Sequence, residues 1–226
     1  MNYFAHGRAF VEDPFFLAGT ALPDWMNVVD RRNRARSRSA LRWIENDDSD
    51  LARLAAGVVR HHADDAWFHE TASFASLSLG FTRLIRDHLP NDEGFRPHFL
   101  GHILVEILLD DVLIAADPAR LDAYYQALDD LDDQAVCRAV ERIVPRPVPD
   151  LGRFIQLFSR ERFLSDYADD GKLLFRLNQV MRRVGLPTLP PEFAAVLPEM
   201  RHAVAERQTE LLTPDTANRG VAASTH

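Results

Sequence analysis

The feature that most constrains the fold is the segment 96–111, RPHFLGHILVEILLDD, which is apolar at most positions. Its polar exceptions His98, His102, Glu106 and Asp110 recur every four residues. In an α-helix, four residues turn about 40° past one full turn and rise about 6 Å. The four side chains would therefore lie in one stripe that winds slowly around an otherwise hydrophobic helix. Burial of such a stripe is costly unless each polar group has a partner, and a metal ion is a common partner for histidines and acids.

A second stripe with the same spacing lies earlier in the chain. The segment 51–89 is predicted to be helical, with a bend within 71–78, and it carries His61, Asp65 and His69 at steps of four. Most neighbouring side chains are apolar, so part of this helix is expected to be buried. Two stripes of matching composition predict two helices that face a shared polar site.

Other polar residues accompany the stripes. His6 lies among aromatic residues, and Asp24 projects from a turn predicted at 18–26, where glycine and proline interrupt the apolar pattern. His62 and Asp64 point away from the second stripe and are expected to be exposed. We expect Asp110 or Asp64 to orient a histidine rather than to bind metal directly, since an acid one turn away can fix an imidazole tautomer.

The rest of the chain predicts an all-α fold without strand alternation, internal repeat or glycine-rich phosphate loop. We expect about eight to ten helices in a single multi-helix domain over residues 1–212, with a metal site between helices of the first half. Residues 1–117 would form the metal-bearing half, and residues 118–212 would supply covering helices. Residues 213–226 are predicted to be a disordered tail.

Bulk properties exclude several classes of protein. The net charge of −8 does not favour nucleic acid or an anionic membrane as a partner. The single cysteine, Cys137, permits neither an intrachain disulfide nor a cysteine-based zinc cluster, and it suits a reducing cytoplasm. The longest apolar run, 103–114, is interrupted by acids and too short to span a bilayer, and no signal peptide is evident. We expect a cytoplasmic protein, either monomer or homodimer.

Imidazole and carboxylate groups together are typical ligands of zinc, manganese and iron(II). Helical bundles build metal sites from inward-facing histidines and acids, and a site without cysteine indicates catalysis with bound water. We predict one or two divalent ions of Zn, Mn or Fe. The predicted ligands are His6, Asp24, His61, Asp65, His98, His102 and Glu106.

Such a site predicts hydrolysis of phosphoesters, and of phosphodiesters in particular, by metal-activated water. The predicted catalytic groups are Asp65, Glu106 and His69, and the predicted phosphate-binding groups are Arg60, Arg31 and Arg34. Six arginines fall within residues 30–42. They would form a rim that attracts phosphate, a docking patch for an acidic partner, or simply a solvated face.

Two alternatives stand beside this hypothesis. A buried histidine can be a hydrogen-bonded core residue, and acids spaced four from histidines can be surface pairs. The chain would then be a non-catalytic helical scaffold or binding protein with a structural or degraded metal site. A di-iron oxidoreductase of the ferritin type is disfavoured because the Glu-x2-His spacing of such bundles is missing.

The pattern also resembles a known family. His61-x3-Asp65 with His69, then His102-x3-Glu106, preceded by Asp24 and His6, resembles the zinc-dependent phospholipase C family and its single-strand nuclease relatives. The resemblance implies an all-α phosphodiesterase or phosphomonoesterase with a three-zinc cluster, held by those seven residues. The chain differs in beginning with Met1, where that family has a processed tryptophan ligand and is secreted.

A second resemblance is to the acyl carrier protein phosphodiesterases, which are near the HD-type phosphohydrolases. It is carried by the opening MNYFAH, by Leu-x-Asp ending at Asp24, by Gly57-x3-His61-x3-Asp65, and by HFL at 98–100. It implies a cytoplasmic, manganese-dependent enzyme acting on a phosphopantetheine linkage, with the arginines facing an acidic carrier protein. Pro97 replaces that family's Asp, and the chain has no His-Asp dipeptide. Together the resemblances imply, as substrate, a phosphorylated small molecule or a phosphodiester of phosphopantetheine or lipid type.

Overall fold

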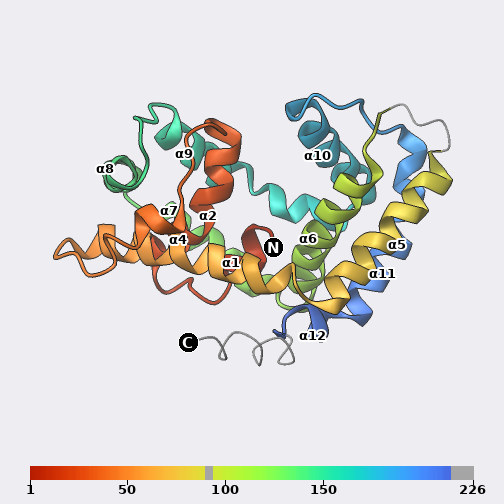
Figure 1. The fold of residues 1–226 in the computed structure, drawn as a ribbon, viewed down its shortest axis with the longest axis horizontal. Helices are drawn as coiled ribbons and strands as arrows, with labels where there is room; N and C mark the ends of the chain where they lie inside the picture. The colour runs from red at the N-terminus through yellow and green to blue at the C-terminus, as the bar shows by residue number, and fades with distance from the viewer. Residues whose placement is uncertain (90–93, 215–226) are drawn as a thin grey trace, which may run out of the picture. The chain divides into compact units, whose positions relative to one another are not determined.

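The computed structural model describes residues 1–89 and 94–214 (Figure 1). All regular secondary structure in these residues is helical, which confirms the predicted fold class. Nine of the α-helices, α2 and α4 to α11, have ten or more residues, within the predicted range. The helices are α1 (Tyr3–Gly7), α2 (Pro14–Val29), α3 (Ser37–Ala40), α4 (Ser49–Phe68), α5 (Ala72–His88), α6 (Pro97–Ala116), α7 (Pro118–Asp129), α8 (Asp133–Ile143), α9 (Leu151–Glu161), η1 (Phe163–Ala168), α10 (Asp170–Arg183), η2 (Pro191–Val196), α11 (Leu197–Glu206) and α12 (Gln208–Leu211).

The chain divides into two compact units. Unit 1 comprises Met1–Asp64 and Leu113–Asp166, and unit 2 comprises Asp65–Val112 and Tyr167–His226. Each unit therefore combines an early and a late segment of the chain, and the unit boundaries fall within α4, α6 and η1. The covering role of residues 118–212 stays a prediction. The predicted tail at 213–226 falls outside the described residues except for its first two positions.

Helix starts follow local capping signals. Asp13 caps α2, since its side chain accepts a hydrogen bond from the backbone N–H of Phe16 at 3.2 Å, with Pro14 in the first turn. Asp117 caps α7 in the same way, with Pro118 at the start of the helix. The N–H groups of the first helical turn have no acceptor within the helix, so a proline, which lacks an N–H, costs no hydrogen bond there. Both helix starts could therefore be predicted from the sequence.

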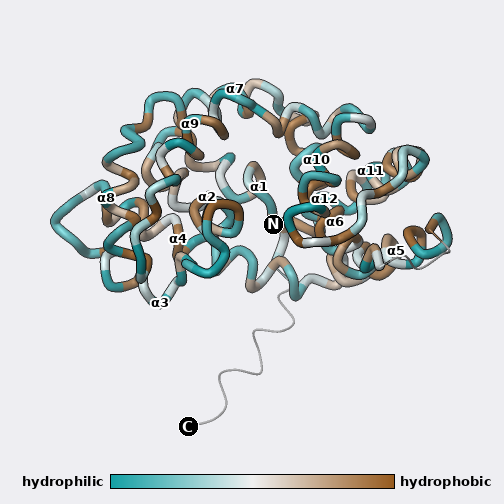
Figure 2. Tube along the Cα trace, turned by 90° about the horizontal axis from the view of Figure 1, so that it is seen from above, coloured by the Kyte–Doolittle hydropathy of each residue, from teal (hydrophilic) through white to brown (hydrophobic). Residues whose placement is uncertain are grey.

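The turn predicted at 18–26 is wrong, because α2 continues through Pro23 to Val29. A proline inside a helix costs about 3 kcal/mol. However, Leu22, Trp25 and Met26 are all at most 1% exposed, and each such burial contributes about 1.5–3 kcal/mol. The free energy gained by burying this face of α2 therefore exceeds the cost of the interior proline. Figure 2 shows hydrophobic residues concentrated along α2.

Two glycines bring α2 and α4 into backbone contact within unit 1. A Cβ atom added at Gly57 would lie 2.2 Å from the carbonyl oxygen of Phe16 and 2.8 Å from the Cα of Gly19. Only glycine permits such an approach. The contact fixes α4 against α2 one helical turn before His61.

The segment predicted as one bent helix is instead two helices, α4 and α5, in the structure. The break lies at residues 69–71, slightly before the predicted bend, and Thr71 caps α5 by accepting from the N–H of Phe74 at 3.2 Å. In unit 2, α6 packs closely on α5, because a Cβ at Gly101 would lie 2.7 Å from the carbonyl oxygen of Ser78. No described helix is both long and apolar enough to cross a membrane.

Candidate metal centres

Six side chains gather into two groups that could each hold a metal ion. The first group is His6, His61 and Asp65, and the second group is His69, His102 and Glu106. Within each group, every residue offers one ligand atom that lies within 4.8 Å of the other two. Both groups combine two imidazoles with one carboxylate and contain no cysteine. This donor chemistry fits zinc, manganese or iron(II).

The first group joins two short stretches of chain. His6 comes from α1, whereas His61 and Asp65 lie one turn apart on the uninterrupted helix α4. The rings of His6 and His61 stack, with centroids 4.1 Å apart and an interplanar angle of 27°. The two histidines are 1% and 3% exposed, and Asp65 is half-buried. The imidazoles are therefore held in protein, and the carboxylate is the group that reaches toward solvent.

A backbone carbonyl sets the tautomer of His61. Its Nδ1 lies 2.8 Å from the carbonyl oxygen of Thr20 on α2. A carbonyl oxygen can only accept a hydrogen bond, so Nδ1 must donate its proton, and neutral His61 then keeps a lone pair on Nε2. Metal-binding histidines are usually oriented by such a bond from the other ring nitrogen. His61 is therefore prepared to bind through Nε2.

The predicted exposure of Asp64 is wrong, because this residue is only 4% exposed. Both of its oxygens lie 2.8 Å from Nε of Arg60, one turn earlier on α4. One oxygen also lies 3.7 Å from Nδ1 of His6. The ion pair explains the burial, because the guanidinium offsets the charge of a carboxylate that is withdrawn from water. Arg60, a predicted phosphate-binding residue, is thus engaged with Asp64.

The second group lies within unit 2. His69 directly follows the end of α4, while His102 and Glu106 are one turn apart on α6. The Oε1 atom of Glu106 lies 2.8 Å from Nε2 of His69 and 3.3 Å from Nε2 of His102. Two ligand atoms about 2.0–2.1 Å from one tetrahedral zinc ion would lie about 3.3 Å apart, so small shifts would admit an ion.

The second group is more accessible than the first. The side chains of His69, His102 and Glu106 are 33%, 36% and 18% exposed. The ring of Phe74 flanks both imidazoles, with centroid distances of 4.8 Å and 4.9 Å. The ring of Phe74 therefore covers one side of the second group, and the partly exposed side chains of the group remain accessible to solvent.

The Glu106 carboxyl is held in its ionised form. Burial raises its pKa, but nearby positive charge and hydrogen bonds from His102 and His69 outweigh that effect and lower the pKa well below its usual range. An ionised carboxylate facing two imidazole nitrogens is the state that a divalent cation requires.

Two predicted ligands, Asp24 and His98, belong to neither of these groups. His98 is exposed on α6, one turn before His102, and Asp24 is half-buried on α2, one turn after Thr20. Residues eight apart on a helix are separated by about 12 Å along its axis. His98 and Glu106 therefore cannot bind one ion, and the same holds for His61 and His69.

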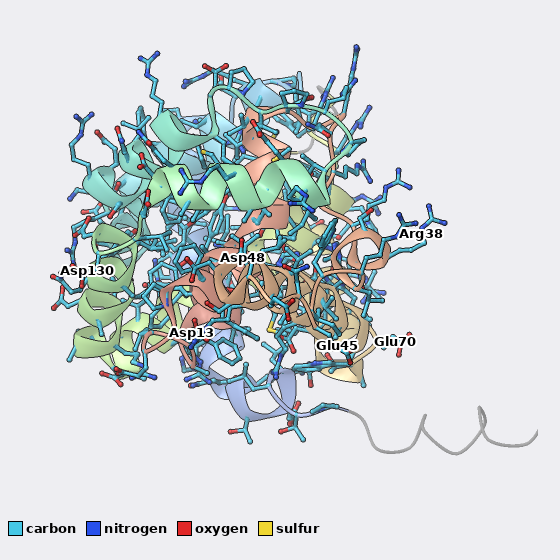
Figure 3. The ribbon with its side chains drawn as sticks, turned by 90° about the vertical axis from the view of Figure 1, so that its left-hand side faces the viewer. Asp13, Arg38, Glu45, Asp48, Glu70 and Asp130 are labelled. Atoms are coloured by element: carbon cyan, nitrogen blue, oxygen red, sulfur yellow. The ribbon has the colours of Figure 1, made fainter. Side chains whose placement is uncertain are left out.

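The predicted phosphate-binding residues Arg31 and Arg34 are exposed in the loop before α3. Figure 3 shows the neighbouring Arg38 projecting from the surface of the molecule. The backbone of this loop is anchored on its buried side, because Asn33 is fully buried and its side-chain amide donates to the carbonyl oxygen of Arg146 at 2.7 Å. The segment thus presents arginines on an anchored backbone.

Comparisons with known proteins add no family to this description. No protein-family model, no curated protein and no solved structure matches the chain. The fold and the two groups define an all-α protein with two clusters of histidine and acid that could hold metal ions.

Proposed function

We propose that the chain is a metal-dependent hydrolase of phosphoesters, and of phosphodiesters in particular. The observation that supports this most strongly is the presence of two groups with the same donor set, two imidazoles and one carboxylate. Sites with three protein ligands of this kind leave positions for water and substrate, whereas structural zinc sites usually complete their shell with cysteine. A divalent ion in such a site lowers the pKa of water and stabilises negative charge on a phosphoryl oxygen.

The protein side chains supply the remaining functions. Asp65 would orient water or accept its proton, and Glu106 would orient water as an ionised carboxylate. His69 would complete the ligands of the second group or act on the substrate. The exposed Arg31 and Arg34 would attract the phosphate of the substrate. The substrate would be a phosphorylated small molecule or a phosphodiester of phosphopantetheine or lipid type.

The experiment is a reconstitution assay. Protein stripped with a chelator is loaded with zinc, manganese or iron(II) and assayed with bis(p-nitrophenyl) phosphate and p-nitrophenyl phosphate. We expect turnover only after loading, and a loss of at least about 100-fold in the variant that carries both His61→Ala and His102→Ala. Turnover that survives complete removal of metal would contradict the proposal.

His202→Ala provides a matched control. His202 and Glu206 on α11 have the same spacing as His102 and Glu106, with 3.3 Å between Nε2 and Oε1, but the pair is exposed and belongs to neither group. This variant should keep full activity. Bound metal in the wild type with no turnover of any ester would instead favour the non-catalytic metal-binding scaffold.

A further inference from the structure

We infer that Asp64, held by Arg60, is a positioning residue that fixes the tautomer of His6 and leaves its Nε2 atom for a metal ion. The inference rests on the metal site of the proposed function, although not on its reaction. It also assigns Arg60 a role in building the site instead of binding substrate.

The first step concerns the charge of Asp64. Its side chain is 6% exposed, so an unpaired carboxylate there would be costly. Arg60 supplies the partner through Nε, at 2.8 Å from both oxygens. Its guanidinium carbon also lies 5.5 Å from the centre of the Phe10 ring, which limits its movement. Asp64 is thereby held in one orientation beside α1.

The second step concerns His6, whose side chain is fully buried. The Oδ2 atom of Asp64 lies 3.7 Å from its Nδ1 atom, slightly beyond hydrogen-bond distance. A fixed carboxylate at this position attracts a proton on Nδ1, so neutral His6 keeps its lone pair on Nε2. Carboxylates commonly orient metal-binding histidines in this way.

The third step compares the two stacked imidazoles of the first group. His61 has its Nδ1 atom directed to the carbonyl oxygen of Thr20, and His6 has its Nδ1 atom beside Asp64. In each ring the Nδ1 atom thus faces an oxygen atom, which is hydrogen-bonded in His61 and 3.7 Å away in His6. The geometry points to two imidazoles in the same tautomer, each with its lone pair on Nε2, where one ion next to Asp65 would bind.

The test uses three variants in a His102→Ala background, where only the first group is complete. Asp64→Leu removes the oxygen acceptor at similar volume, and Asp64→Asn keeps an acceptor without charge. Arg53→Gln is the matched control, because Arg53 lies on the same helix and forms an equivalent ion pair with Asp13, with Nε 2.8 Å and 2.9 Å from its oxygens, away from the group.

Two readouts separate positioning from general structure. Long-range 1H–15N NMR of the metal-free protein reports the tautomer of His6, which is assigned with His6→Gln. Zinc titration then gives the Kd. We expect Nδ1–H in the parent protein, loss of that preference in Asp64→Leu, and a Kd raised about 10- to 100-fold. Asp64→Asn should be intermediate, and Arg53→Gln should change neither readout.

The outcomes also distinguish this inference from the proposed function. An unchanged tautomer and an unchanged Kd in Asp64→Leu would overturn the inference, while zinc binding by the parent would leave the proposed function standing. A parent protein that binds no zinc would count against the proposed function, and the tautomer readout would still decide whether Asp64 orients His6.

Discussion

Gly19 of α2 and Gly57 of α4 are in direct backbone contact, and this contact places His61 against Thr20. His61 follows Gly57 by one helical turn, and Thr20 follows Gly19 directly. The 2.8 Å hydrogen bond from Nδ1 of His61 to the carbonyl oxygen of Thr20 therefore depends on how closely the two helices approach. A close backbone contact between two helices thus helps to set the tautomer of a candidate metal ligand.

Gly57→Ala is expected to disturb both the packing and the site. The added methyl group would overlap the carbonyl oxygen of Phe16, so the helices must separate, at a cost of about 1–3 kcal/mol in the free energy of unfolding. Zinc binding at the first group should weaken with it. Urea denaturation of the metal-free protein and zinc titration check the two effects.

The control for this prediction is Gly80→Ala. Gly80 is an exposed position within α5, where an added Cβ meets nothing within 4 Å. There the same substitution should stabilise the protein by about 0.4–1 kcal/mol, since alanine is the better helix former. Equal effects of the two substitutions would show that the contact between α2 and α4 has no special role.

Arg201→Met is expected to destabilise unit 2 strongly. Arg201 donates from Nε to Asp111, whose side chain is 4% exposed, and from Nη2 to the carbonyl oxygen of Tyr167 at 3.0 Å. Removing the cation leaves a buried carboxylate unpaired, which costs about 3 kcal/mol or more. Chemical denaturation measures the loss. Arg160→Met breaks an exposed ion pair with Glu161 and should cost less than about 1 kcal/mol.

The stability of the metal-free protein should depend on pH through Glu106. The pKa of this carboxyl is lowered in the folded state, so its ionised form favours folding above the unfolded value of about 4.3. That contribution is lost as the pH falls through this region toward the lower folded pKa. The difference in unfolding free energy between wild type and Glu106→Gln should shrink between pH 6 and pH 3. A difference independent of pH would mean that Glu106 is not held ionised.

The arginines before α3 can be tested through kinetics. If Arg31 and Arg34 attract substrate phosphate, their replacement by glutamine should raise KM about two- to fivefold each and leave kcat unchanged, because exposed ionic contacts are weak. The effect should fade at high salt. Arg86→Gln, at an exposed position on α5, is the control. A fall in kcat at constant KM would contradict a role limited to binding.

The helices were predictable because their signals are local. The capping of α7 by Asp117 and Pro118, and the four-residue spacing of polar side chains along the apolar helix α6, can be read from a few neighbouring residues. The continuation of α2 through Pro23 could not be predicted, since it depends on burial against helices distant in sequence. Asp64 is likewise buried beside a residue distant in sequence, His6, although its spacing from Arg60 was a visible signal for an ion pair.

The candidate ligands were predicted more fully than their arrangement. Five of the seven predicted ligands, together with His69, lie in the two groups. The stripe from His61 to His69 is divided between them because eight helical residues extend too far for one ion. The orienting role of Thr20 had no signal in the sequence, since a backbone carbonyl is present at every residue.

The most direct test of the central claim is the zinc content of untagged protein, stripped with a chelator, equilibrated with zinc and desalted before elemental analysis. Two groups predict about two equivalents in the wild type and in His202→Ala, one in His61→Ala, one in His102→Ala, and none in the double variant. Circular dichroism should show all of them to be helical. Folded wild-type protein that takes up no zinc, or single variants that keep the full content, would contradict the account.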